Sequence, residues 1–265
     1  MRVNIQDTTL YVEQAGEGQP LLLIHGFPLN LEMWRPQLET LSQHAKVIAP
    51  DLRGHGQSTP TPGPYSMDML ADDCAEILEK LGIQQPVVVC GLSMGGYVGF
   101  SFLRRHPQMV AGLILVATRA GADSEEGKNN RDNAAQQVKS EGIQPVIDSM
   151  LPILMAPNTY QEQFDLVDQV EEIVAQTSSD GMISALMGMK TRPDSMPTLK
   201  KIKLPTLIIH GAEDQIIPIS EAEAMHFAVV GSRFEIIPDA GHLPNLEQSQ
   251  LFNQVVKDFL STLQD

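Results

Sequence analysis

The chain has 265 residues, enough for one large α/β domain with an insertion or at most two small domains. Its 42% hydrophobic content, 20 glycines and 18 prolines are ordinary for a globular protein and argue against disorder. The formal net charge of −15 makes nucleic acids and anionic membrane surfaces poor partners, so we expect neither, and it favours a neutral substrate over a polyanion.

The cytoplasm is the compartment expected from the sequence. The apolar runs are far shorter than a bilayer-spanning segment, and the first residues carry no apolar signal core. The two cysteines, Cys74 and Cys90, lack the spacing of metal ligands. We therefore expect no metal site and no disulfide.

The pattern of apolar residues predicts strands and helices in alternation. Two alternating segments at 2–6 and 10–14, separated by a turn, predict an antiparallel edge hairpin. Further strands, most of them apolar runs typical of burial on both faces, are predicted at 20–26, 46–50, 87–91, 112–117, 205–210 and 233–238. Helical periodicity occurs at 34–43, 66–81, 94–106, 220–229 and 247–263. This order predicts an α/β fold with a mostly parallel eight-stranded sheet flanked by helices.

The interval between the sixth and seventh predicted strands is too long for a loop. It carries helical periodicity at 131–140, 143–154, 160–175 and 181–189. We therefore predict a helical cap at residues 122–196, inserted into a core formed by residues 1–121 and 197–265. Methionines are concentrated here, and they either form an adaptable apolar wall over a site or only hold the cap helices together. They are Met150, Met155, Met182, Met187, Met189 and Met196.

The strongest functional signal lies where the predicted strand at 87–91 ends. Gly91, Ser93 and Gly95 form a Gly-x-Ser-x-Gly motif, and a helical pattern follows at once. A strand that turns into a helix this sharply forces the residue at the tip into a strained backbone conformation, which small neighbours make possible. The context predicts that Ser93 is an exposed nucleophile at a helix N-terminus, where the dipole favours a developing negative charge.

A serine nucleophile needs a general base, and the base needs an orienting carboxylate. In this architecture the acid follows the serine in the chain and the histidine comes last. His242, in a glycine-led loop after the last predicted strand, is the predicted base. Asp214, on a turn after the preceding strand, is the predicted acid, because its short side chain points rigidly toward the histidine loop. Glu213 is the runner-up, and Asp239 lies too close to His242 in sequence to be a good partner.

An oxyanion hole requires two backbone N–H donors. The residue after the nucleophile, Met94, is predicted to supply one, and Phe27, in the loop after the third strand, the other. Pro28 has no amide hydrogen and cannot be the second donor. His25 and His55 lie near the ends of strands, where structural hydrogen bonds are the expected role.

The motifs HGFP at 25–28, DLRGHGQS at 51–58, GLSMGG at 91–96 and GHLPNLE at 241–247, with the Asp214 turn, resemble the α/β-hydrolase superfamily over essentially the whole chain. Within it the chain is similar to capped esterases, enol-lactonases and cofactor-free haloperoxidases (perhydrolases). The resemblance implies a Ser93–His242–Asp214 triad, with the amides of Phe27 and Met94 as the oxyanion hole. Haloalkane dehalogenases and epoxide hydrolases use a carboxylate as nucleophile, and carbon–carbon bond hydrolases usually have an HG loop richer in glycine.

These residues predict an enzyme that cleaves small neutral carboxylic esters through an acyl-Ser93 intermediate, with His242 transferring the protons. A lactonase acting on enol-lactones or acyl-lactones, or a perhydrolase with peroxide as the second nucleophile, would use the same residues. A non-catalytic receptor for a small ligand is the alternative from another class, but it would not need all three roles. The expected partner is a small ester or lactone, and the chemistry requires no cofactor and no metal.

The cap is predicted to turn methionine and leucine side chains toward Ser93 and to select uncharged acyl groups of modest size. An anionic enol-lactone would instead need a cation turned toward the site. Six basic side chains of this region could supply it: Arg119, Lys128, Arg131, Lys139, Lys190 and Arg192.

Overall fold

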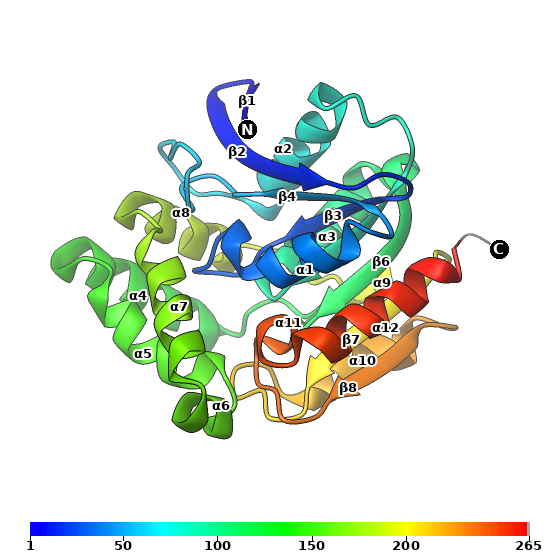
Figure 1. Cartoon of the computed structure of the whole chain (residues 1–265). Helices are drawn as coiled ribbons and strands as arrows, with labels where there is room; N and C mark the ends of the chain where they lie inside the picture. The colour runs from blue at the N-terminus through cyan, green and yellow to red at the C-terminus, as the bar shows by residue number, and fades with distance from the viewer. Residues whose placement is uncertain (264–265) are drawn as a thin grey trace.

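An eight-stranded sheet forms the centre of the computed structural model, which describes residues 1–263 (Figure 1). The strands are β1 (Arg2–Ile5), β2 (Thr8–Ala15), β3 (Pro20–Ile24), β4 (Lys46–Pro50), β5 (Val87–Leu92), β6 (Val110–Val116), β7 (Thr206–Gly211) and β8 (Arg233–Ile237). Their order across the sheet is β1-β2-β4-β3-β5-β6-β7-β8. Strand β2 pairs antiparallel with β1 and β4, and all other neighbours are parallel. The predicted fold class is confirmed.

Helices connect the strands and cover the sheet, as the alternating pattern predicts. Those of the core are α1 (Arg35–Leu41), α2 (Met67–Lys80), α3 (Met94–Arg105), α10 (Ile219–Ala228), α11 (Pro244–Glu247) and α12 (Ser249–Ser261), with short 3₁₀ turns η1 (Leu31–Trp34) and η2 (Pro107–Met109). Helix α1 packs with α12, and α2 packs with α3. Strands β3, β5 and β7 are buried along their whole length, which is why they read as uninterrupted apolar runs.

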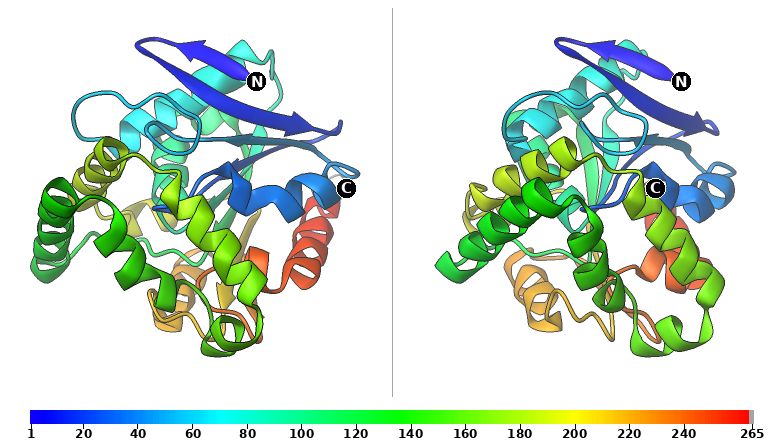
Figure 2. Two further views of the ribbon diagram at one scale, coloured as in Figure 1. Left: turned by 60° about the vertical axis from the view of Figure 1, so that its left-hand side comes forward. Right: turned by 90° about the vertical axis from the view of Figure 1, so that its left-hand side faces the viewer.

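Six helices fill the long interval between β6 and β7. They are α4 (Glu125–Glu141), α5 (Gln144–Leu154), α6 (Pro157–Glu162), α7 (Phe164–Ala175), α8 (Ser179–Lys190) and α9 (Met196–Leu199). In Figures 1 and 2 the green helices α4 to α7 gather on one side of the molecule, away from the N-terminal hairpin. Met155, Met182 and Met189 are buried in the same continuous hydrophobic cluster as the sheet. The interval therefore packs onto the core rather than forming a separate globule.

Most predicted helix ends lie within two residues of those in the structure, and three predicted helices differ more. The pattern at 160–175 is divided into α6 and α7, because Gln163 has a non-helical backbone at φ −116° and ψ 62°. The segment at 247–263 divides in the same way at Gln248, with φ −127° and ψ 50°. Helix α4 begins six residues before its predicted start, where the Ser124 side chain accepts a hydrogen bond from the Gly127 N–H. Among residues 1–263, no helix combines the length and the apolarity needed to cross a bilayer.

Candidate active site

Ser93 occupies the sharp turn between β5 and α3. Its backbone has φ +54° and ψ −112°, a conformation that costs a non-glycine residue about 1–3 kcal/mol. Close packing explains the two motif glycines. A Cβ on Gly91 would lie 2.2 Å from the Gly95 carbonyl oxygen, and a Cβ on Gly95 would lie 2.1 Å from the carbonyl oxygen of Ile24. The motif therefore reflects the space that this turn requires.

The strained turn is held by hydrogen bonds from the neighbouring strand. The Ser93 N–H donates to the carbonyl oxygen of Val116 over 2.9 Å, and the Thr118 hydroxyl donates to the Ser93 carbonyl oxygen over 2.8 Å. These bonds leave the Ser93 hydroxyl unused, and the residue remains partly exposed. A rigidly held, partly exposed serine above the carboxyl ends of parallel strands is well placed to react with a ligand.

The structure brings His242 and Asp214 together. The Nδ1 atom of His242 lies 2.8 Å from Oδ2 of Asp214, and the two side chains are 2% and 0% exposed. The second carboxylate oxygen accepts hydrogen bonds from the N–H groups of Ile216 (2.8 Å) and Ile217 (3.0 Å). Burial alone would raise the pKa of Asp214, but His242 and these donors hold it below its usual value. The acid is therefore ionised at neutral pH and fixes the orientation of the imidazole.

The two competing carboxylates do not contact His242 in the described residues. Asp239 is exposed and has a backbone φ of +51°. Glu213 is partly exposed, and its N–H donates to the carbonyl oxygen of Ala240 over 2.9 Å.

One further residue, which the sequence did not single out, lies beside the acid. His210, buried at the end of β7, has its Nε2 atom 3.6 Å from Asp214 and 2.9 Å from the carbonyl oxygen of Ile217.

The two predicted oxyanion donors are free for a ligand. Within residues 1–263, neither the Phe27 N–H nor the Met94 N–H has a hydrogen-bond acceptor. The loop that carries Phe27 lies against the nucleophile, since a Cβ on Gly26 would be 3.5 Å from the Cβ of Ser93. Buried N–H groups without acceptors are rare, and two unpaired backbone donors are what an oxyanion hole requires.

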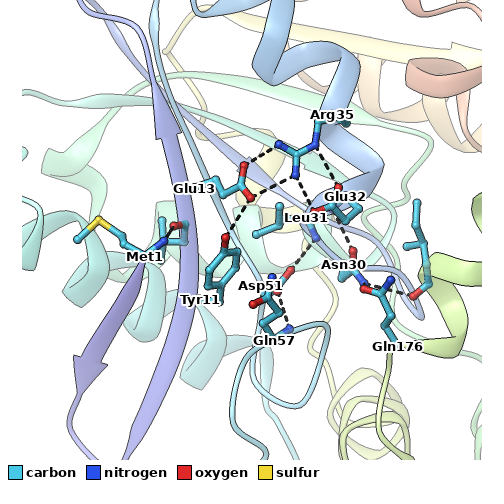
Figure 3. Close-up of polar contacts among 12 residues, drawn as sticks. Met1, Tyr11, Glu13, Asn30, Leu31, Glu32, Arg35, Asp51, Gln57 and Gln176 are labelled. Carbon is cyan, nitrogen blue, oxygen red and sulfur yellow. Dashed lines mark hydrogen bonds and ion pairs between the residues drawn. The ribbon is translucent and has the colours of Figure 1, made fainter.

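Several contacts anchor the loop after β3 (Figure 3). The Leu31 N–H donates to Oδ1 of the buried Asp51 over 2.8 Å. The Asn30 side chain reaches the cap, donating to the carbonyl oxygen of Ile173 (3.2 Å) and to Gln176 (3.0 Å). The Thr177 hydroxyl, also from the cap, donates to the carbonyl oxygen of Pro28 over 2.7 Å. Cap and core together therefore fix the loop that presents the Phe27 N–H.

His25 and His55 make the structural hydrogen bonds that were predicted. The Nε2 atom of His25 accepts from the Leu52 N–H over 2.9 Å, so its Nδ1–H donates to the carbonyl oxygen of Gly26 at 2.9 Å. The Nδ1 atom of His55 lies 2.8 Å from the carbonyl oxygen of Arg53. Both rings are fully buried and lie 5.0 Å apart. They position the loops around the site and are not exposed to a ligand.

The burial of His55 predicts a measurable pH dependence of stability. Burial lowers the pKa of His55 to about 4, whereas an unfolded histidine titrates near 6.5. This contribution to stability is complete above pH 6.5 and is lost as the pH falls toward 4, because only the unfolded chain then binds the proton. Between pH 7.5 and 5.5 the loss should be about 1 kcal/mol.

Urea unfolding of the wild type and of His55→Asn at these two pH values tests this prediction. The asparagine amide can replace Nδ1 as donor to the Arg53 carbonyl oxygen but does not titrate. The loss of stability between the two pH values should be about 1 kcal/mol smaller in the variant. An equal loss in both proteins would contradict the assignment.

The described residues contain no group of three or more histidine, cysteine, aspartate and glutamate side chains arranged to hold a metal ion. Cys74 and Cys90 are free and fully buried, and burial raises the pKa of both thiols. Neither thiol is thus activated as a nucleophile, which leaves Ser93 as the candidate that the fold positions.

Comparison with known proteins agrees with this geometry. A family model described as the alpha/beta hydrolase fold matches residues 19–249. The 3-oxoadipate enol-lactonase 2 of Acinetobacter baylyi is 30% identical over 254 residues, which cover 95% of this chain and 93% of the relative. A thermophilic esterase from Thermogutta terrifontis, solved with malate bound, has a TM-score of 0.96 and 39% identity over 99% of each chain.

The enol-lactonase from Burkholderia xenovorans has a TM-score of 0.92 and 28% identity, with 98% of this chain and 100% of that chain covered. These two solved structures therefore share the fold of this protein over nearly its whole length. The family match, the strained Ser93 turn and the eight-stranded sheet lead to one conclusion: the chain belongs to the α/β-hydrolase family.

Proposed function

We propose that this protein is a serine hydrolase that cleaves small carboxylic esters through an acyl-Ser93 intermediate. One observation carries the proposal. The ionised Asp214 carboxylate, in the loop after β7, fixes His242, in the loop after β8, by a 2.8 Å hydrogen bond. Both loops lie at the carboxyl edge of the parallel strands, where Ser93 follows β5. Such a set supplies a nucleophile, an oriented base and two oxyanion donors, which is what acyl transfer requires.

The hydrogen bond to Asp214 determines which ring nitrogen of neutral His242 carries the proton. Because Nδ1–H donates to the carboxylate, the Nε2 lone pair is free to accept the Ser93 proton as the hydroxyl attacks the ester carbonyl. The N–H groups of Phe27 and Met94 stabilise the resulting oxyanion. His242 then gives the proton to the leaving alcohol, and the acyl group remains on Ser93.

Deacylation repeats the same steps with water. His242 removes a proton from a water molecule that attacks the acyl-Ser93 carbonyl, and the proton returns to Ser93 as the acid leaves. A lactonase would use an identical cycle with the leaving alcohol tethered to the acyl group. A perhydrolase would replace the water by hydrogen peroxide and release a peracid.

Hydrolysis of p-nitrophenyl butyrate by the purified protein tests the proposal. We expect release of p-nitrophenolate with turnover, and complete loss of activity after one equivalent of an organophosphonate that modifies serine nucleophiles. A protein that binds the ester but does not turn it over would instead be a ligand receptor on a hydrolase scaffold. Parallel assays with a simple lactone and with added peroxide distinguish an esterase, a lactonase and a perhydrolase.

The charge of the preferred substrate depends on the basic residues around the cap, and most of them are paired. Three arginines converge on Asp123, whose side chain is 1% exposed: Arg119 at 2.7 Å, Arg131 at 2.5 Å and Arg192 at 2.8 Å. The lysine pairs are Lys128–Glu125 at 2.7 Å and Lys190–Asp132 at 2.6 Å. Lys139 is exposed on α4. This pairing supports a neutral substrate, because these cations already have carboxylate partners.

We therefore expect p-nitrophenyl butyrate to have a higher kcat/KM than p-nitrophenyl hemisuccinate, an anion with an acyl chain of the same length. Burying an unpaired carboxylate against apolar side chains costs free energy. A cost of about 1.4 kcal/mol in the transition state already lowers kcat/KM tenfold. Steady-state kinetics on the two esters measure the preference directly.

The enol-lactonase alternative, which requires an anionic substrate, rests on a specific observation. Asp123 balances only one of its three arginines, and the Nε atoms of Arg119 and Arg192 are buried without a partner in the described part of the chain. A preference for the hemisuccinate that disappears in Arg119→Gln would overturn the neutral-substrate expectation and favour this alternative. The similarity of the chain to two enol-lactonases also supports this alternative.

A further inference from the structure

A buried carboxylate lies directly behind the loop that carries His242. Glu247, at the end of α11, is only 6% exposed. Its Oε1 atom accepts hydrogen bonds from the N–H groups of Gly241 (2.8 Å) and Leu243 (3.2 Å), the two residues that flank His242 in the chain. The backbone on both sides of the imidazole is therefore attached to one carboxylate oxygen.

The other oxygen of the same carboxylate reaches the cap. Oε2 accepts a hydrogen bond of 2.7 Å from the N–H of Ala156, the residue that precedes α6. The Thr159 side chain, one turn further along α6 and 2% exposed, also contacts this carboxylate. Glu247 thus joins the histidine loop to the cap through a set of hydrogen bonds that leaves neither oxygen free.

The cap segment at residues 155–156 is itself fixed between the acid and histidine loops. The side chain of Gln215, the residue after Asp214, donates to the carbonyl oxygen of Met155 over 3.1 Å. A Cβ on Gly241 would lie 2.5 Å from the Ala156 nitrogen, so the two backbones are in direct contact. Movement of this cap segment would therefore displace the support of both loops.

The chemistry of the bonds indicates why a carboxylate occupies this place. Burial raises the pKa of Glu247, while the N–H donors around it oppose that shift, and no basic side chain pairs with it among residues 1–263. Hydrogen bonds to a charged acceptor are about twice as strong as those between neutral groups. A carboxylate that accepts from three backbone N–H groups on two segments holds both more rigidly than a neutral side chain could.

We propose that Glu247 is a positioning residue for His242, and that it uses the cap at Ala156 as its second support. The inference rests on the proposed function, in which His242 is the general base. In the described part of the chain the Glu247 carboxylate hydrogen-bonds to the His242 loop and the cap, so it acts through the loop and not on the substrate. A displacement of the reacting groups by about 1 Å can cost a hundredfold in rate, so the loop must be held closely.

The Glu247→Gln variant tests the proposal. A glutamine oxygen can still accept from the Gly241 and Leu243 N–H groups, but its NH₂ group meets the Ala156 N–H donor to donor. We expect kcat for p-nitrophenyl butyrate to fall by about 10- to 100-fold with KM nearly unchanged. The downfield proton NMR signal of the hydrogen bond between His242 and Asp214 should shift or broaden, which a change in global stability alone would not cause.

Two further variants keep the test decisive. Asp73→Asn removes another buried carboxylate, the partner of Arg53, far from the His242 loop, and should lower Tm while leaving kcat and the NMR signal unchanged. Thr159→Val, which leaves the carboxylate in place, should lower kcat less than Glu247→Gln and supplies the test if the glutamine variant does not fold.

The outcomes separate this inference from the proposed function. An active wild type with Glu247→Gln and Thr159→Val both within twofold in kcat, and an unchanged NMR signal, would overturn the positioning role alone. A wild type without turnover of any ester or lactone would overturn both. If Asp73→Asn lowered kcat as much as Glu247→Gln does, the effect of Glu247 would come from the stability of the fold alone.

Discussion

Replacing Ser93 by alanine should reduce hydrolysis of p-nitrophenyl butyrate by about 10⁵- to 10⁶-fold, judged from serine triads in other folds. The substitution removes the oxygen atom that carries the acyl group in the proposed mechanism, and the backbone turn is compatible with alanine as much as with serine. Because the Ser93 hydroxyl makes no hydrogen bond in the described residues, Tm should change by no more than about 2 °C. Initial rates and thermal unfolding of the purified variant measure both effects.

Ser101→Ala is a matched control on the same helix. Ser101 is fully buried and donates its hydroxyl to Asp68, so alanine should lower stability while leaving turnover at the wild-type level in the folded protein. A Ser93→Ala variant that kept more than a small residue of the activity would mean that another group is the nucleophile.

The Asp214→Asn variant should lose about 10⁴-fold in kcat. The asparagine oxygen can still accept from the Ile216 and Ile217 N–H groups, so the turn should remain folded. Its amide, however, offers a donor to Nδ1 of His242 and favours the tautomer that carries the proton on Nε2. In that tautomer the imidazole cannot accept the Ser93 proton.

Assays of Glu213→Gln and Asp239→Asn beside Asp214→Asn complete this test. Among the described residues neither control side chain forms a hydrogen bond or an ion pair with His242, so their kcat values should stay within a few-fold of the wild type. A severe loss in Glu213→Gln with a mild one in Asp214→Asn would reverse the assignment of the acid.

The sheet and the serine turn could be predicted because their signals are local. Strand β5 is an apolar run buried on both faces, and the Gly91, Ser93 and Gly95 motif lies within five residues, although the space that excludes a side chain at Gly95 is taken by the carbonyl oxygen of Ile24 on β3. The helix predicted at 66–81 is also present, and the Ser66 side chain at its start accepts a hydrogen bond from the Met69 N–H. Where the residues that give the signal lie within one or two turns of backbone, their pattern is enough for the prediction.

The cap was harder to predict because its bounds depend on polar and tertiary contacts. The first two turns of α4 contain almost no apolar residues, so periodicity missed them, although Ser124 followed by Glu125 and Glu126 is a helix-start signal. The break at Gln163 carries no glycine or proline to mark it. Periodicity therefore located the helices of the cap better than it located their ends.

Contacts between segments far apart in the chain could not be predicted from the sequence. Glu247 stood in a recognised motif, yet its bond to Ala156 joins residues 91 positions apart and leaves no local pattern. The arginines at 119, 131 and 192 likewise gave no sign that they share Asp123. The candidate site could thus be predicted as a set of residue types, while the way cap and core hold it together required the folded structure.

The proposed covalent intermediate on Ser93 can be detected by mass spectrometry of acid-quenched enzyme. Wild-type protein mixed with p-nitrophenyl butyrate and quenched within the first turnovers should gain the mass of one butyryl group, mapped by peptide analysis to Ser93. The Asp214→Asn variant should gain and lose that mass more slowly, and Ser93→Ala should gain none. An adduct on another residue would mean that Ser93 is not the nucleophile. Sustained turnover without any adduct at Ser93, even when the enzyme is trapped with an organophosphonate, would mean the same.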